Sequence, residues 1–255
     1  MTSHGTENTI LSVDRAFEIL ETIRDRGEVG VTEIADQLKV SKSTVHNHLN
    51  TMETRGYVVN EDGEYRLGLR FLSFPDTLQK SNRLYQTAKE EVDELVKRTG
   101  ERSQVLVEEN GYGVYIYQQV DDRAIRTSSR VGTQVSLHSS AIGKSLLAFQ
   151  PPEKVDRILD RDGLPAQTEH TITSREEFDT ELERIREEGV AYDDEEGIEG
   201  MRCVASPIRN ENSVSVGAIS VSGPCTRIKN ERFESELPQE VERAAQAIEI
   251  NYRYS

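Results

Sequence analysis

Residues 32–57, TEIADQLKVSKSTVHNHLNTMETRGY, contain two short stretches of helical periodicity separated by a few residues. Apolar residues recur every three to four positions in each stretch, which gives each expected helix one buried face. These residues are Ile34, Ala35 and Leu38 in the first stretch, Val45, Leu49 and Met52 in the second, and Val40 between them. Thr32 and Ser41 stand where N-caps are expected, and Gly56 ends the second helix. The segment therefore predicts two helices joined by a tight turn.

A small hairpin is expected directly after the second helix. Residues 57–59 and 65–67 alternate as short strands, and the residues between them contain the turn-forming pair Asp62-Gly63. Helix, turn, helix and hairpin in this order predict a winged helix-turn-helix, whose second helix would enter the major groove of DNA. The alternative is an ordinary helical hairpin with polar outer faces, which does not explain why all four elements occur together.

The polar side chains of this unit are candidates for contacts with double-stranded DNA. Short donors and acceptors suit base edges and phosphate oxygens, and the second helix would present them in the major groove. The candidate residues are Thr32, Ser41, Lys42, Ser43, Thr44, His46, Asn47 and Asn50, together with Arg66 in the expected hairpin.

The net charge of the chain is −15, opposite in sign to the charge that phosphate neutralisation favours. The first 80 residues carry nine Lys or Arg against thirteen Asp or Glu, which is −4, but residues 38–56 carry three basic residues and one acid. The surface expected to meet DNA is therefore mildly basic. An acidic excess with 8 lysines against 23 arginines suggests adaptation to a high-salt cytoplasm, as in a halophilic archaeon, and ordinary bacterial acidity is the alternative.

Neither a membrane span nor a secretion signal is expected. The chain has no apolar run of the length that a bilayer requires, and residues 1–9 lack the regions of a signal peptide, so a cytoplasmic protein without a membrane partner is predicted. Cys203 and Cys225 are too few for a disulfide framework and match no zinc spacing, which predicts reduced thiols. No metal site and no cofactor are expected.

The remainder of the chain predicts a second domain of the α+β class. A helix beginning near Ser12 has apolar positions 13, 16, 17, 20 and 23, and Pro75 is expected to break or kink any helix in residues 67–81. This places a linker at 75–82 between domains 1–74 and 83–255. Strands and helices then mix without regular β-α-β alternation, which favours α+β over a doubly wound sheet. The expected helices are 82–100, 140–149, 152–160, 174–188 and 238–252, and the expected strands are 103–108, 114–120, 204–209 and 215–222.

Five sequence blocks in order resemble the IclR (isocitrate-lyase regulator) family of transcription factors. They are SVDRAFEIL at 12–20, VSKSTVHNHLNTMETRGYV at 40–58, LHSSAIGKSLLA at 137–148, DDEEGIEGMRCVASPI at 193–208 and GAISVSGPCTRI at 217–228. The resemblance spans about residues 10–250. It implies an N-terminal winged helix-turn-helix and a C-terminal effector domain similar to the GAF fold, with an antiparallel sheet. It also implies a homodimer or homotetramer that binds a palindromic operator and senses a small metabolite, often an organic or sugar-derived acid.

The same resemblance implies an effector pocket built from three of these blocks. Its residues in this chain are Ala141 and Ile142, then Asp193, Met201 and Cys203, and finally Ser220 and Ser222. Backbone N–H groups at the start of the helix near residue 140 would favour a carboxylate, and the two serines alternate, so both hydroxyls point to one face of a strand. The alternatives are that the cysteine is a small buried filler, that the serines form an edge-strand polar face, and that residues 193–196 form a solvated loop.

Three residues depart from the pattern of the family. Asn47 and His48 stand where family recognition helices often carry an arginine and a leucine. Asn47 could hydrogen-bond an adenine edge in bidentate fashion, so we expect a different operator. His48 lies beside the buried face and is expected to be a half-buried neutral histidine. Pro75 is expected to interrupt the interdomain helix that the family typically shows.

Enzyme motifs are incomplete in this chain. Gly143-Lys144-Ser145 mimics the end of a phosphate-binding loop, but His138 stands where that loop needs a glycine. No Gly-x-Ser-x-Gly elbow occurs, and Cys203 has no histidine nearby in the sequence. We therefore expect no enzymatic activity. The remaining alternative to a regulator is a GAF-like ligand or redox sensing module that uses the winged helix for protein contacts.

Overall fold

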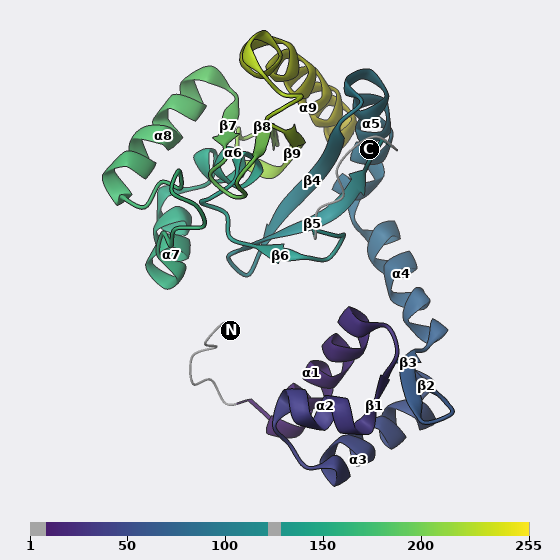
Figure 1. Ribbon diagram of the computed structural model, residues 1–255. Helices are drawn as coiled ribbons and strands as arrows, with labels where there is room; N and C mark the ends of the chain where they lie inside the picture. The colour runs from purple at the N-terminus through teal and green to yellow at the C-terminus, as the bar shows by residue number, and fades with distance from the viewer. Residues whose placement is uncertain (1–8, 122–128, 255) are drawn as a thin grey trace. The chain divides into compact units, whose positions relative to one another are not determined.

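The computed structural model describes residues 9–121 and 129–254, and the chain divides between Ser81 and Asn82 into two compact units (Figure 1). The N-terminal unit is a winged helix-turn-helix, as predicted. Its elements are α1 (Leu11–Arg26), β1 (Val29–Gly30), α2 (Val31–Leu38), α3 (Lys42–Thr54), β2 (Val58–Glu61), β3 (Glu64–Leu67), a 3₁₀ helix (Leu69–Leu72) and α4 (Ser73–Ser81). The strands form an antiparallel sheet in the order β1-β3-β2.

The hairpin between β2 and β3 closes through the predicted Asp-Gly pair. Asp62 has a φ of 55° and Gly63 a φ of 95°, so both residues lie in the left-handed region. A two-residue hairpin turn of type I′ needs positive φ at both central positions, and its geometry matches the right-handed twist of the strands. This explains why Asp and Gly stand there.

The core of this unit contains every apolar residue predicted for the two helices within 32–57 and the turn between them, although Leu38 and Val40 are only partly buried. It is formed by Ile19, Ile23, Val29, Ile34, Ala35, Val45, Leu49, Met52, Val58 and Tyr65. The expected apolar positions of α1 divide differently, because Ile23 is fully buried whereas Val13 and Phe17 are exposed, Phe17 by 61%. α1 therefore contributes its C-terminal half to the core and leaves apolar residues at its start in contact with solvent.

The prediction for the cap of α2 was wrong, and the prediction for the cap of α3 is confirmed. α2 begins at Val31 with Gly30 as its N-cap, and the Gly30 N–H donates to Glu33 Oε2 at 3.4 Å, so Thr32 lies inside the first turn. For α3, the Thr44 N–H donates to Ser41 Oγ at 3.0 Å. Glycine can occupy an N-cap position, and here the Glu33 side chain accepts from the N-cap N–H, which is the half of a capping box that needs no side chain on the N-cap residue.

Pro75 does not break a helix, contrary to the prediction. It lies in the first turn of α4, where a backbone N–H has no intrahelical acceptor and proline therefore removes no bond. The helix is interrupted instead at Asn82, which has a φ of −93° and a ψ of 104°. Its side chain accepts a hydrogen bond from the Tyr85 N–H at 2.9 Å and so begins the next helix.

The C-terminal unit is an α+β domain around one antiparallel sheet, as predicted. Its elements are α5 (Arg83–Thr99), β4 (Arg102–Glu109), β5 (Tyr112–Gln119), β6 (Gln134–Val135), α6 (Ala141–Ala148), α7 (Pro152–Asp162), α8 (Arg175–Glu188), β7 (Ala191–Asp194), β8 (Met201–Arg209), β9 (Ser215–Pro224), a π-helical turn (Arg232–Glu236) and α9 (Leu237–Tyr254). The strand order is β6-β5-β4-β9-β8-β7. The strands β6 and β7 were not predicted, and β7 replaces part of the solvated loop that the acidic run 193–196 had indicated.

Two apolar cores lie on opposite faces of this sheet. The helices α5 and α9 cover one face, and α6 lies across the other face and contacts α8 (Figure 1). The five residues of α5 that were predicted to face inward, Leu84, Ala88, Val92, Leu95 and Val96, are all buried. No helix among the described residues is both long enough and apolar enough to cross a membrane.

Candidate functional site

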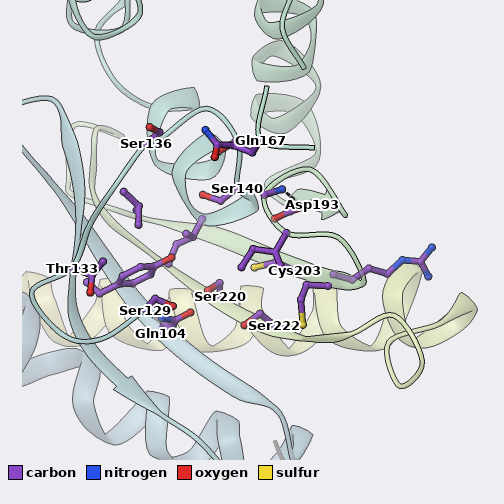
Figure 2. A pocket seen from close by; sticks show the side chains of 18 residues that line it. Gln104, Ser129, Thr133, Ser136, Ser140, Gln167, Asp193, Cys203, Ser220 and Ser222 are labelled. Atoms are coloured by element: carbon purple, nitrogen blue, oxygen red, sulfur yellow. Dashed lines mark hydrogen bonds between the residues drawn. The ribbon is translucent and has the colours of Figure 1, made fainter. Parts of the chain in front are cut away.

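A cavity of about 340 Å³ lies between the start of α6 and the adjoining face of the sheet (Figure 2). Six of the seven residues predicted for the effector pocket line it, namely Ile142, Asp193, Met201, Cys203, Ser220 and Ser222. Ala141 is different. It is fully buried in the apolar core and is not a lining residue, so the prediction of a pocket-wall role for its side chain is not supported by its position.

Strand register explains why residues distant in the sequence meet here. Asp193 on β7 lies opposite Cys203 on β8, and Cys203 lies opposite Ser222 on β9. On the other side of β9, Ser220 lies opposite Gln104 on β4. Residues opposite one another in adjacent strands share a face of the sheet, so the polar side chains form continuous rows across the floor of the cavity.

Asp193 is buried, with 7% of its surface exposed. Its Oδ1 accepts hydrogen bonds from the backbone N–H groups of Glu196 at 2.7 Å and Gly197 at 3.3 Å. Burial raises the pKa of this carboxyl to about 7, and the neighbouring Glu196 carboxylate adds to the rise, while the two N–H donors and Lys144 oppose it. Near neutral pH the group is therefore present both as an acid that donates and as a carboxylate that accepts.

Cys203 is a protonated thiol in this environment. Burial, and then the charge of Asp193, raises the pKa of the thiol far above its ordinary range, whereas the Ser220 hydroxyl lowers it. A reactive cysteine needs an accessible thiolate, which this site does not provide. The geometry therefore favours Cys203 as a small, polarisable part of the cavity wall rather than as a redox sensor. Burial also raises the pKa of Tyr115, another residue that lines the cavity, so its phenol stays neutral.

Sequence reasoning missed most of the remaining wall. The additional lining residues are Gln104, Tyr115, Ser129, Thr133, Val135, Ser136, Ser139, Ser140, Gln167, Gly197, Ile198 and Arg202. Ser140 had a usable signal in the sequence, because a serine directly before a helix is a common N-cap. In the structure its Oγ accepts from the Gly143 N–H at 3.3 Å. Gln104 had none, because its place opposite Ser220 depends on strand register.

Gly143 is required by close packing at the start of α6. A Cβ at this position would lie 2.2 Å from the carbonyl oxygen of Leu137, so no other residue fits without moving the backbone. The absence of a side chain lets residues 137–140 lie against the helix and brings Ser139 and Ser140 to the cavity.

The candidate DNA contacts on α3 lie at the surface of the N-terminal unit. Lys42, Ser43, His46, Asn47 and Asn50 are exposed, whereas the half-buried Thr44 shares a hydrogen bond of 2.8 Å between its hydroxyl and that of the exposed Ser41. Thr32 is exposed on α2, and His48 is half-buried as expected. Arg66 is bound to the Glu61 carboxylate of the neighbouring strand, with Nε at 3.0 Å from Oε1, so a contact with phosphate would require this pair to open.

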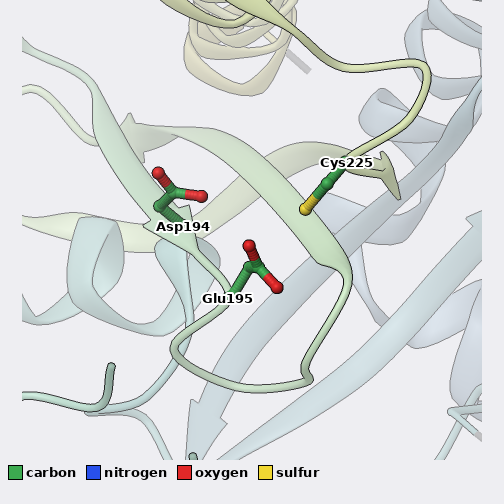
Figure 3. A group of neighbouring side chains, drawn as sticks. All are labelled: Asp194, Glu195 and Cys225. Atoms are coloured by element: carbon green, nitrogen blue, oxygen red, sulfur yellow. The ribbon is translucent and has the colours of Figure 1, made fainter. Parts of the chain in front are cut away.

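A second cluster of polar groups lies beside β7 and consists of Asp194, Glu195 and Cys225 (Figure 3). Their ligand atoms lie within 4.8 Å of one another, as metal ligands would. Both carboxylates already have partners, however. Asp194 accepts from the Arg202 guanidinium at 2.6 and 3.1 Å, and Glu195 accepts from the Gly200 N–H at 2.7 Å. These contacts explain the cluster as a structural feature of the turn between β7 and β8.

Comparisons with known proteins match both units. The family model described as the IclR helix-turn-helix domain matches residues 12–62, and the model described as the bacterial transcriptional regulator IclR C-terminal matches residues 77–250. The chain is 31% identical over 252 residues to the probable HTH-type transcriptional regulator ArcR of Halobacterium salinarum, with 97% of this chain and 96% of the relative covered.

Solved structures agree with the sequence comparisons. The crystal structure of the Thermotoga maritima IclR has a TM-score of 0.81 at 30% identity, covering 96% of this chain and 99% of that one. An IclR homologue from Microbacterium hydrocarbonoxydans complexed with 4-hydroxybenzoate also has a TM-score of 0.81, at 26% identity, covering 96% and 100%. This chain belongs to the IclR family of transcriptional regulators, with an N-terminal helix-turn-helix domain and a C-terminal effector-binding domain.

Proposed function

We propose that this regulator binds a sugar-derived or other small organic acid in the cavity beside α6, and that binding changes its affinity for a DNA operator. The observation that carries the proposal is the row formed by Asp193, Cys203 and Ser222 on the cavity floor. Serine, threonine and glutamine side chains suit hydroxyl groups of a ligand, while Ile142 and Met201 supply apolar walls. No reaction is proposed for the site.

An acidic ligand fits two further features. Backbone N–H groups at the start of α6 favour a carboxylate there. Asp193 has a pKa of about 7, so it can take up a proton and donate a hydrogen bond to an anion that enters the cavity. The complex of the Microbacterium homologue with 4-hydroxybenzoate, itself an organic acid, supports the same ligand class.

We propose that α3 reads the major groove and that Asn47 is the main base contact. Its amide can pair with an adenine edge, and good bidentate pairs are worth about 1–3 kcal/mol of discrimination. The other candidate residues, Thr32, Ser41, Lys42, Ser43, Thr44, His46, Asn50 and Arg66, would position the helix through the phosphates and neighbouring bases. The proposed DNA partner is a palindromic operator.

Self-association is part of the proposal, because one short helix reads few base pairs and two-fold symmetry doubles the contacts. Two apolar segments of the N-terminal unit are exposed and suit a second copy of the chain. They comprise Ile10, Leu11, Val13 and Phe17 around the start of α1, and Leu69, Leu72, Phe74 and Leu78 around α4. Sedimentation of the wild type and of Phe17→Glu tests this, and identical mass distributions would contradict a role for α1.

DNase footprinting on the protein's own promoter region tests the main proposal. Asn47→Ala should weaken operator binding by about 10-fold or more, because 1.4 kcal/mol corresponds to a factor of ten. Asn212→Ala, which changes an exposed asparagine of the C-terminal unit, is the matched control and should leave the footprint unchanged. Added D-gluconate or 4-hydroxybenzoate should alter the footprint of the wild type, and equal footprints for both variants would refute the role of Asn47.

We also propose that the acidic surface is an adaptation to high salt. A net charge of −15 creates self-repulsion that dissolved salt screens. Thermal unfolding measured from low to molar KCl should show a rising melting temperature. A melting temperature that does not depend on KCl would support ordinary acidity instead.

A further inference from the structure

Lys144 on α6 places a buried ammonium group behind the cavity. The residue is 1% exposed, and its Nζ lies 2.5 Å from Glu196 Oε1 and 3.0 Å from Glu181 Oε1. Glu181 belongs to α8 and is also paired with Arg184, whereas Glu196 belongs to the turn between β7 and β8. A charge so deeply buried needs carboxylate partners, because desolvation of an isolated ion is very costly. One ammonium group therefore joins α6, α8 and this turn.

The turn between β7 and β8, residues 195–200, forms one wall of the cavity. Gly197 and Ile198 line the cavity directly, and the N–H groups of Glu196 and Gly197 hold Asp193. The backbone of this turn is constrained at two positions. Glu195 has a φ of 65°, which is unfavourable for a residue with a Cβ, and a Cβ on Gly197 would lie 2.8 Å from the Ser139 carbonyl oxygen. Such a turn keeps its shape only where other contacts hold it.

The contacts that hold this turn converge on Glu196. Its carbonyl oxygen accepts from Thr171 Oγ1 at 2.7 Å and Thr168 Oγ1 at 3.2 Å, and its carboxylate receives Lys144. Within the described part of the chain, Oε2 of Glu196 is buried without a hydrogen-bond partner. Burial raises the pKa of Glu196, and the contact between Oε1 and Lys144 opposes this rise and so offsets part of the cost of burying the carboxylate.

We propose that Lys144 is a positioning residue for the effector, which holds Glu196 so that the turn presents Asp193 to the cavity in one fixed orientation. The inference rests on the proposed function of the cavity as the effector site. Lys144 does not line the cavity, so it reaches the ligand only indirectly, through the turn and through its charge on Asp193. Removing the link should loosen the N–H groups on Asp193 and weaken effector binding, although no side chain that lines the cavity is replaced.

The charges around Asp193 provide an independent signature. The carboxylate of Glu196 raises the pKa of Asp193, and the ammonium group of Lys144 lowers it, while Cys203 and Tyr115 face it as neutral groups. Lys144→Met should therefore raise the pKa of Asp193, and Glu196→Ala should lower it. Carbon-detected NMR of the Asp193 carboxyl would measure these opposite shifts, and their absence would contradict the arrangement of charges on which the inference rests.

Glu196→Ala and Glu181→Ala form a matched pair of variants. Each removes one carboxylate from the same Nζ, but only Glu196 belongs to the turn. Hydrogen exchange of the full-length protein without ligand should be about 10-fold faster at the amides of residues 196 and 197 in Glu196→Ala and in Lys144→Met. In Glu181→Ala these amides should stay within about 3-fold of the wild type. Equal protection in all variants, or equal loss in the matched pair, would overturn the inference.

Calorimetry with D-gluconate and with 4-hydroxybenzoate then measures binding directly. Affinity should fall about 10-fold in Glu196→Ala and in Lys144→Met, and the double variant should be no weaker than either single one, because both act through one contact. Glu181→Ala should bind like the wild type. If the wild type binds neither acid, the proposed ligand class fails, and the exchange experiment still decides whether Lys144 positions the turn.

Discussion

The two faces of the six-stranded sheet are formed by the same strands and each carries an apolar core, but only the face beside α6 also carries a polar cavity. On β9, Ile219 and Val221 pack in the core under α5 and α9, while Ser220 and Ser222 face the cavity beside α6. We call the face under α5 and α9 the closed face, and the face with the cavity beside α6 the open face. Successive side chains of a strand point to opposite sides, so each strand contributes to both.

The difference shows how this unit separates stability from binding. Fully burying a Val or Ile side chain contributes about 1.5–3 kcal/mol, and the open face forgoes this contribution wherever serine or glutamine stands on the cavity floor. The closed face compensates because its core is continuous across β4, β8 and β9. Mutations on the two faces should therefore affect different measurements.

The largest expected effect is on the closed face. Ile219→Ala should lower the free energy of unfolding by about 3 kcal/mol, because Ile219 is fully buried and its removal leaves a cavity in a continuous core. Urea unfolding measures this loss. The affinity for D-gluconate should change by less than about twofold, since the side chain does not reach the open face. A loss of affinity as large as the loss of stability would remove the distinction between the faces.

The second effect concerns a charged residue of the open face. Asp193 has a folded pKa of about 7 against an ordinary value of 3.8, so between these pH values the folded state binds more protons than the unfolded state. Stability must then fall as pH rises through this range. Asp193→Asn removes this cost, and its gain in unfolding free energy should be about 2–3 kcal/mol larger at pH 8 than at pH 5.

Asp194→Asn is the control for this pH dependence. Asp194 is the next residue on β7, is exposed and pairs with Arg202, so its loss should bring no gain that grows with pH. Denaturant unfolding at both pH values decides the question. A constant difference between Asp193→Asn and wild type from pH 5 to pH 8 would mean that burial does not hold the proton on this carboxyl.

Periodic features of the fold could be predicted from the sequence. The buried faces of α2, α3 and α5 follow from their spacing, and Ser41 follows from helix-capping chemistry. The short strands β6 and β7 could not be predicted, because two to four residues carry no period, and β7 includes two acidic residues that suggest a loop. Thr32 was misassigned as a cap because a hydroxyl near a helix start does not reveal that Gly30 and Glu33 form the cap.

The candidate site also contains residues that the sequence could predict and residues that it could not. Alternation places Ser220 and Ser222 on one face, and family resemblance places Asp193 and Cys203 near them. Gln104 depends on the register of β4 with β9, which no local pattern encodes. The ion pair of Lys144 joins positions 52 residues apart, and its sequence context suggested only an incomplete phosphate loop.

The third effect is a change of shape on the open face. Ser220→Leu should fill part of the cavity and abolish the response of operator binding to D-gluconate, while the protein still binds DNA. The cost in stability should be about 1 kcal/mol, at the low end for added core volume, because the cavity offers space. Gel shifts with and without the acid measure the response. Ser220→Ala, which keeps the cavity open, should retain a weakened response, and a normal response in Ser220→Leu would remove this residue from the site.

The smallest expected effect is that of Ser222→Ala, which removes one hydroxyl group from the open face. Comparing it with Val221→Thr, which adds one hydroxyl group to the closed face at the adjacent residue, distinguishes the two faces most sharply. Ser222→Ala should leave the free energy of unfolding within about 0.5 kcal/mol of the wild type, and D-gluconate should bind about 3- to 10-fold more weakly for the loss of one hydrogen bond. Val221→Thr adds a hydroxyl of similar size to the closed face. Val221→Thr should lower the free energy of unfolding by about 1–3 kcal/mol without changing the affinity for D-gluconate, because the apolar core offers the buried hydroxyl no hydrogen-bond partner. Equal stability of the two variants would show that the closed face tolerates polar atoms as well as the open face does.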